Sequence, residues 1–175
     1  MSMLKGLLIL FCILQNCYAK PLESPNLGQP VDTRLIKLLN RDIFPDGKGL
    51  PAGSGTSQAG MSVYQQHCVA CHGEDGTGDS ADELAGAQHA LTDEPPDKVI
   101  GTYWPYATTI FDFIRRSMPM RKPGILSNNE LYAVTAYLLH LNGIISEKQK
   151  IDSKTLPLIK MPNRNGFINV YQSEK

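Results

Sequence analysis

The stretch CVACH at residues 68–72 decides how the rest of the chain is interpreted. Two cysteines three positions apart, followed at once by a histidine, fit a thioredoxin-like redox pair, half of a zinc site, or covalent attachment of a c-type haem. A zinc site needs a second pair of ligands at similar spacing, and the remaining histidines, His67, His89 and His140, form no such pair. A redox pair needs strand-like alternation around it, which is absent here. The haem interpretation is therefore favoured.

Haem attachment uses every chemically distinctive residue of this stretch. The thiols of Cys68 and Cys71 add to the two vinyl groups on one edge of the macrocycle, and the imidazole of His72 then reaches the iron. We therefore expect one covalent haem c, bound through Cys68 and Cys71, with His72 as one axial ligand.

The second axial ligand separates an electron carrier from a haem that reacts with oxygen or peroxide. Met118 is favoured because Pro119 fixes the backbone of an extended loop before the next helix, and Met120 is the alternative. A thioether opposite an imidazole stabilises ferrous iron and suits single-electron transfer. No nucleophile–base pair is apparent elsewhere, so the chain is not expected to be catalytic alone. The other side chains considered are Met61, Met161, His67, His89 and His140.

Helical patterns surround the haem motif. One helix is expected to begin at Thr56 or Ser57 and to run into the motif, and Gly60 within it predicts close approach of another helix. A second helix is expected over residues 107–117 with three apolar side chains inward, namely Ile110, Phe113 and Ile114.

The last helix has the clearest sequence signature. Ser127 and Glu130 form a capping box, and residues 142–143, Asn-Gly, end the pattern. Apolar side chains follow at helical spacing at Leu131, Val134, Tyr137, Leu138 and Leu141. The predicted fold class is therefore all-α, a small helical bundle around one haem.

The chain is expected to have four segments. Residues 1–19 resemble a cleaved secretory signal peptide, so we expect a periplasmic protein with no stable membrane span after cleavage. Residues 20–57 are a Pro/Gly-rich extended arm that allows one short helix around 33–39. Residues 58–145 are the haem domain, and residues 146–175 are a C-terminal tail wrapped on the surface.

Charge is balanced over the whole chain but unevenly distributed. The 175 residues hold 17 basic and 17 acidic side chains, which gives no reason to expect nucleic-acid binding. Residues 73–97 hold eight acidic and no basic residues, whereas residues 98–175 hold eleven basic and five acidic ones. The basic residues that bracket Met118 form either a rim that steers an acidic redox partner or an ordinary solvated surface; they are Arg115, Arg116, Arg121 and Lys122.

Two aromatic residues have polar groups suited to the haem edge. Tyr103 and Trp104 are expected either to bond the haem propionates through their O–H and N–H groups or to pack in the core.

The combination of these features resembles the class I c-type cytochromes. The features are Gly60, Tyr64, the haem motif, Met118 with Pro119, and the helix of Val134 and Tyr137. This resemblance implies that the first and last helices cross, with Gly60 and the aromatic residues at the crossing.

Three further stretches resemble the cytochrome subunit of bacterial sulfane dehydrogenase. They lie within residues 42–55, 101–109 and 160–167, of which the middle one, GTYWPYATT, is the most specific. Longer members of that family have a second haem domain, so this chain, with one haem motif, resembles the C-terminal domain. The resemblance implies a partner subunit containing molybdenum, a sulfane or sulfite substrate for that partner, and electron exit through the haem to an acceptor cytochrome or oxidase.

Two other functions remain open at this point. One is a free shuttle cytochrome that donates electrons to a terminal oxidase. The other is an enzyme or gas sensor with an open iron position.

Overall fold

The computed structural model describes residues 27–170, and the chain divides into two units between Leu39 and Asn40. The predicted signal peptide lies outside the described residues. Helix α2, Thr33–Leu39, is the described element of the first unit and covers the residues for which one short helix was expected. Within residues 27–170 no helix is both long enough and apolar enough to cross a bilayer.

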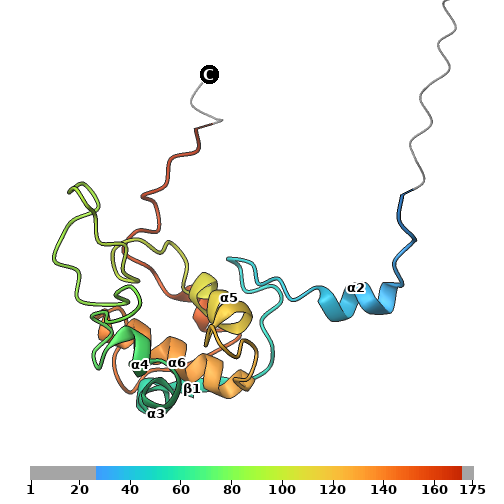
Figure 1. Ribbon diagram of the computed structural model, residues 1–175, viewed down its shortest axis with the longest axis horizontal. Helices are drawn as coiled ribbons and strands as arrows, with labels where there is room; N and C mark the ends of the chain where they lie inside the picture. Colours follow the sequence, from blue (N-terminus) through green and yellow to red (C-terminus); the bar gives the residue numbers. More distant parts are fainter. Residues whose placement is uncertain (1–26, 171–175) are drawn as a thin grey trace, which may run out of the picture. The chain divides into compact units, whose positions relative to one another are not determined.

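The second unit is organised around two crossing helices, α3, Ser57–His67, and α6, Asn128–Leu141 (Figure 1). A Cβ atom added at Gly60 would lie 1.9 Å from the carbonyl oxygen of Ala133 on α6. Beside this contact, the rings of Tyr64 and Tyr137 pack with their centroids 5.2 Å apart. The close approach predicted from Gly60 is therefore confirmed.

The other elements complete a mostly helical unit. Helix α5 packs on α6 and places Phe111 against Tyr132, with ring centroids 4.6 Å apart. A short antiparallel pair of strands, with Gly55 opposite Ile151, also packs against α6. The bounds are β1 Ser54–Thr56, α4 Val69–His72, α5 Ala107–Ser117, β2 Lys150–Asp152 and the 3₁₀ helix η1 Leu156–Leu158.

The strand pair joins two segments that composition had separated from the haem domain. Residues 54–56 fall in the expected arm and residues 150–152 in the expected tail, yet they pair with each other and both contact α6. Residues from Asn40 onward thus form one compact unit.

One local expectation is met and another is corrected. The first helix runs into the motif and ends there, because Cys68, with a φ of −121°, separates α3 from α4. Ile110 and Ile114 are buried as expected, but Phe113 is 45% exposed. Its side chain faces an open cavity, described below, and not the packed core.

Candidate haem site

One large cavity lies beside the haem motif. It has a volume of about 890 Å³, within the range of small-molecule and cofactor sites. Residues of α3, α4, α5 and α6 and of the loops between them line it. Its apolar side chains include Leu84, Ile100, Ile110, Ile114, Val134 and Leu138.

The cavity brings together the side chains that sequence analysis proposed for haem binding. Cys68, Cys71 and His72 line it near α4, and Met118, which ends α5, lines it as well. These four residues come from two regions 46 positions apart in the sequence. The packing of both α3 and α5 on α6 brings the two regions to one space.

His72 is held in the tautomer that a metal ligand requires. Its Nδ1 atom lies 2.8 Å from the backbone oxygen of Asp82. A carbonyl oxygen can only accept a hydrogen bond, so Nδ1 carries a proton, and in the neutral ring the lone pair is then on Nε2. Such a hydrogen bond to the far ring nitrogen is typical of ligating histidines. Sequence reasoning missed Asp82 because a backbone carbonyl has no residue-type signature.

The two cysteines are not bonded to each other, and they differ in their surroundings: Cys68 is half-buried whereas Cys71 is exposed. Both sulfurs are free thiols. Burial, with a smaller contribution from Cys71, raises the pKa of the Cys68 thiol to about 11. A redox-active pair needs the opposite, a lowered pKa that gives a thiolate at neutral pH. The raised pKa of Cys68 is therefore unlike that of the reactive thiol in a thioredoxin-like pair.

The four methionines considered as the second axial ligand differ in their position relative to the cavity and in their exposure. Both Met118 and Met120 line the cavity, but Met118 is half-buried whereas Met120 is 77% exposed. Met161 is buried in the core and Met61 lies on the surface, both outside the lining.

The histidine candidates have other surroundings. His140 directs Nδ1 to the backbone oxygen of Ile145 at 3.2 Å. His89 lies in the exposed loop, and its backbone N–H donates to the Asp97 carboxylate. His67 ends α3, is half-buried and lines the cavity.

The two aromatic candidates face different surroundings. Trp104 lines the cavity and packs edge-on against Phe113, with centroids 5.8 Å apart. Tyr103 is not part of the lining. Its ring packs against Phe167 at 5.4 Å, which is the packing role left open beside the haem contact.

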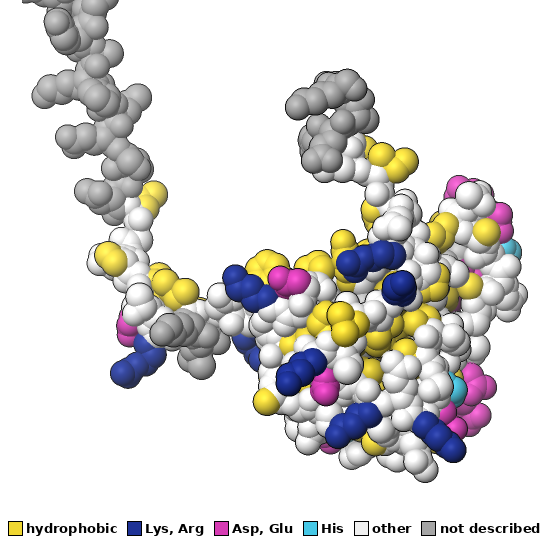
Figure 2. Space-filling view, turned by 180° about the vertical axis from the view of Figure 1, so that it is seen from behind, with side chains coloured by type: hydrophobic (Ala, Val, Ile, Leu, Met, Phe, Trp, Pro, Cys, Tyr) yellow, Lys and Arg dark blue, Asp and Glu magenta, His cyan; other side chains and the backbone are white. Residues whose placement is uncertain are grey.

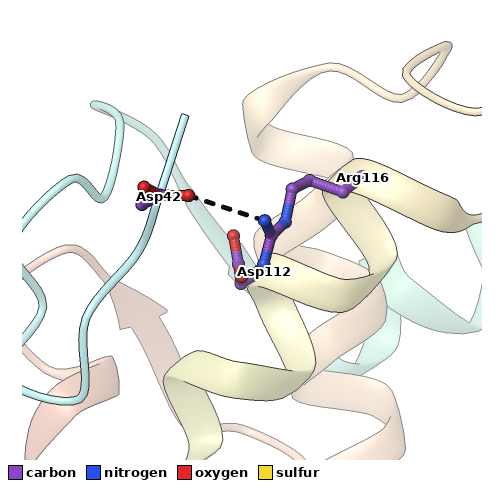
Figure 3. Close-up of polar contacts among 3 residues, drawn as sticks. All are labelled: Asp42, Asp112 and Arg116. Carbon is purple, nitrogen blue, oxygen red and sulfur yellow. Dashed lines mark hydrogen bonds and ion pairs between the residues drawn. The ribbon is translucent and has the colours of Figure 1, made fainter. Parts of the chain in front are cut away.

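The basic rim is smaller than the sequence suggests. Of the four basic residues that bracket Met118, only Arg121 lines the cavity, where Lys98 joins it. Arg116 instead bonds the buried carboxylate of Asp112 and lies 3.5 Å from the Asp42 carboxylate (Figure 3). This cation holds the segment before β1 to α5 and has a structural role.

The charge of the compact unit is divided between regions. Acidic side chains gather at one edge of the face in Figure 2, whereas Lys and Arg side chains surround an apolar area nearer its centre. The acidic edge corresponds to the loop between α4 and α5, which holds the eight acidic residues of 73–97.

The cavity fits a haem by its size, its apolar walls, its free thiols and its preset histidine tautomer. The family model for cytochrome c matches residues 57–142. The chain belongs to the cytochrome c family, whose domain binds haem c covalently and carries electrons.

Two relatives connect this domain to sulfur oxidation. A chain in the crystal structure of the sulfane dehydrogenase SoxCD from Paracoccus pantotrophus matches with a TM-score of 0.76 and 36% identity, over 86% of this chain and 76% of that one. The thiosulfate dehydrogenase of Stutzerimonas stutzeri strain A1501 is 32% identical over 93 residues. That match covers 50% of this chain but only 28% of the relative's length.

Proposed function

We propose that this chain is a periplasmic, single-haem electron-transfer subunit of a molybdenum-dependent sulfane or sulfite dehydrogenase. The observation that carries the proposal is the similarity to a sulfane dehydrogenase chain over most of both lengths, joined to a cavity with the complete set of haem-binding side chains.

In this proposal each residue at the cavity has a defined task. Cys68 and Cys71 would hold the haem through thioether bonds, and His72 and Met118 would ligate its iron. The haem, when bound, supplies a one-electron redox centre. The Asp82 carbonyl keeps the His72 ring oriented, and the apolar walls exclude water, so little rearranges when the charge changes.

The partner and the location follow from different features. The relationship to sulfur-oxidising enzymes supports a molybdenum subunit that oxidises the sulfur compound and passes electrons one at a time to this chain. The signal-like residues 1–19 support export to the periplasm. Electrons then leave to an acceptor cytochrome or oxidase.

The decisive experiment isolates the wild-type holoprotein from the periplasmic fraction of its own cells, beside Met118→Ala and a matched control, Met120→Ala. Wild-type protein and the Met120 variant should co-purify with a molybdenum protein, and their haem should be reduced when thiosulfate, sulfite or a sulfane-sulfur compound is added. Isolation as a single chain that only a terminal oxidase reoxidises would instead establish a free shuttle.

The same three proteins test the axial ligand. Met118→Ala should lose the sulfur-to-iron charge-transfer absorption and lower the reduction potential, because a thioether stabilises ferrous iron. Met120→Ala should keep both properties. If instead Met120→Ala loses the absorption and lowers the potential while Met118→Ala keeps both, Met120 is the ligand. A wild-type protein whose reduced form binds carbon monoxide without losing a ligand would indicate an open iron.

A further inference from the structure

Asn142 is the C-cap residue of α6, and its side chain links three separate parts of the unit. The Nδ2 group donates to the backbone oxygen of Leu84 at 3.0 Å and to that of Leu138 at 2.8 Å. The Oδ1 atom accepts from the backbone N–H of Gly101 at 2.9 Å. One half-buried amide thus satisfies three backbone groups from three segments.

The contact with Gly101 leaves no room for a side chain there. A Cβ atom added at Gly101 would lie 2.8 Å from Oδ1 of Asn142 and 3.2 Å from its Cβ. The backbone around residue 101 is therefore adapted to the amide of Asn142. A helix C-cap does not require these contacts, since Gly143, with a φ of +68°, already ends α6.

The segment that Asn142 holds leads directly to the haem ligand. Leu84 is two residues after Asp82, whose carbonyl orients His72. On the other side of Asp82, the N–H of Ala81 donates to the backbone oxygen of Cys71 at 2.9 Å. The Asp82 carbonyl is thus anchored from the motif on one side and from α6 on the other.

Asn142 also fixes the opposite end of the same loop. Leu84 accepts a second hydrogen bond from the Ile100 N–H at 3.2 Å, and Gly101 follows Ile100. Leu84, Ile100 and Trp104 all line the cavity. The loop between residues 84 and 101 is therefore closed at its base by this backbone hydrogen bond together with the Asn142 side chain, which lies outside the cavity lining.

We propose that Asn142 is a positioning residue for the iron: it holds the Asp82 carbonyl against His72 Nδ1–H and so sets the donor strength of the proximal ligand. This inference rests on the proposed role of His72 as an axial ligand. A firm hydrogen bond at Nδ1 makes the imidazole a stronger donor, which favours ferric iron. Loosening that bond should raise the reduction potential.

The test compares wild-type holoprotein with Asn142→Ala and with Asn142→Asp, which keeps the acceptor but loses the donor to Leu84. The matched control is Asn129→Ala. Asn129 lies at the other end of α6 and also binds a distant backbone group, the Ser54 N–H at 3.0 Å. Ser54 belongs to β1, which is separated from the haem motif by the whole of α3, and the carbonyl that bonds the His72 ring is that of Asp82. The measurements are the reduction potential, the exchange rate of the His72 Nδ1 proton, and thermal unfolding.

Both Asn142 variants should raise the potential and speed exchange of the Nδ1 proton about tenfold, as expected when a hydrogen bond of ordinary net strength is weakened. Asn129→Ala should leave both values unchanged even if it lowers thermal stability. Wild-type values in the Asn142 variants, or equal shifts in the control, would overturn the inference. So would failure of both Asn142 variants to form holoprotein while the control succeeds, because the role would then be structural.

The proton NMR spectra of the ferric proteins, from which the exchange rate is measured, also separate this inference from the proposed function. If the His72 ring protons of the wild-type protein show no paramagnetic shift, His72 is not a ligand and the proposed function itself fails. If they are shifted but insensitive to Asn142, only the positioning role fails.

Discussion

Two residues at the N-terminus of α6, Ser127 and Glu130, show how a short polar motif stabilises a helix that contributes many side chains to the core. Ser127 accepts a hydrogen bond from the Glu130 N–H, and the Glu130 carboxylate accepts from both the side chain and the backbone N–H of Ser127. These donors, the Ser127 side chain first and its backbone second, lower the pKa of Glu130.

Ser127→Ala should therefore destabilise the protein in a pH-dependent way. At neutral pH the loss should be about 1 kcal/mol, as for other N-caps. Because the Glu130 pKa is depressed on folding, its contribution is present above the unfolded pKa and is lost as the pH falls through the folded one. The difference between variant and wild type should thus shrink towards pH 3.

Chemical denaturation across this pH range measures the effect. Asp97 and Asp152 also have lowered pKa values, from backbone N–H donors, but both are present in either protein and cancel in the difference. The control is Ser62→Ala, an exposed position on α3, which should show a small effect without pH dependence. A Ser127 difference that stays constant with pH would contradict the argument.

The residue scale also marks where sequence reasoning reached its limit. Cys68, Cys71 and His72 could be found because haem attachment demands fixed residue types at fixed spacing. Asp82 and Asn142 could not, since one acts through its carbonyl and the other through contacts 41 and 58 positions away.

At the scale of elements, the crossing of α3 and α6 depends on one missing side chain. Helix propensity alone predicts that Gly60→Ala stabilises α3 by about 1 kcal/mol. The structure predicts the opposite sign, because the new Cβ would meet the backbone of Ala133 and the Cβ of Tyr137. Backbone cannot turn aside as a flexible side chain can.

Gly60→Ala should therefore destabilise the protein by about 3 kcal/mol, the upper part of the usual range for overpacking. The control Gln58→Ala, at an exposed position on the same helix, should change the free energy of unfolding by no more than about 0.5 kcal/mol. Thermal or denaturant unfolding of the two variants gives the answer. A stabilised Gly60→Ala protein would mean that the helices separate without cost.

The elements themselves divide by how local their signals are. Helices α5 and α6 match their expected ranges closely, because periodicity and caps are local. The break at Cys68 and the pairing of β1 with β2 had no local signal. The two three-residue strands are far apart in the sequence, and both pack on α6.

At the scale of the whole compact unit, two distant stretches that resembled sulfane dehydrogenase prove to be neighbours. Asn163 donates to the backbone oxygen of Tyr103 at 2.8 Å, and the Arg164 guanidinium lies 4.1 Å from the Tyr106 ring centroid. Phe167 packs on Tyr103. Between Tyr103 and Tyr106 lies Trp104, which lines the cavity.

The C-terminal stretch is therefore expected to hold the Trp104 segment at the cavity wall. A chain that ends after Pro162 keeps the buried Met161 but loses all three contacts. It should retain its helices by far-ultraviolet circular dichroism, yet change the near-ultraviolet signal of Trp104, the only tryptophan, and shift the haem potential. A chain that ends after Gly166 loses the Phe167 contact but keeps those of Asn163 and Arg164, and it should show smaller changes in the same direction. Identical spectra and potentials in all three chains would mean that Trp104 is held by α5 alone, through Phe113.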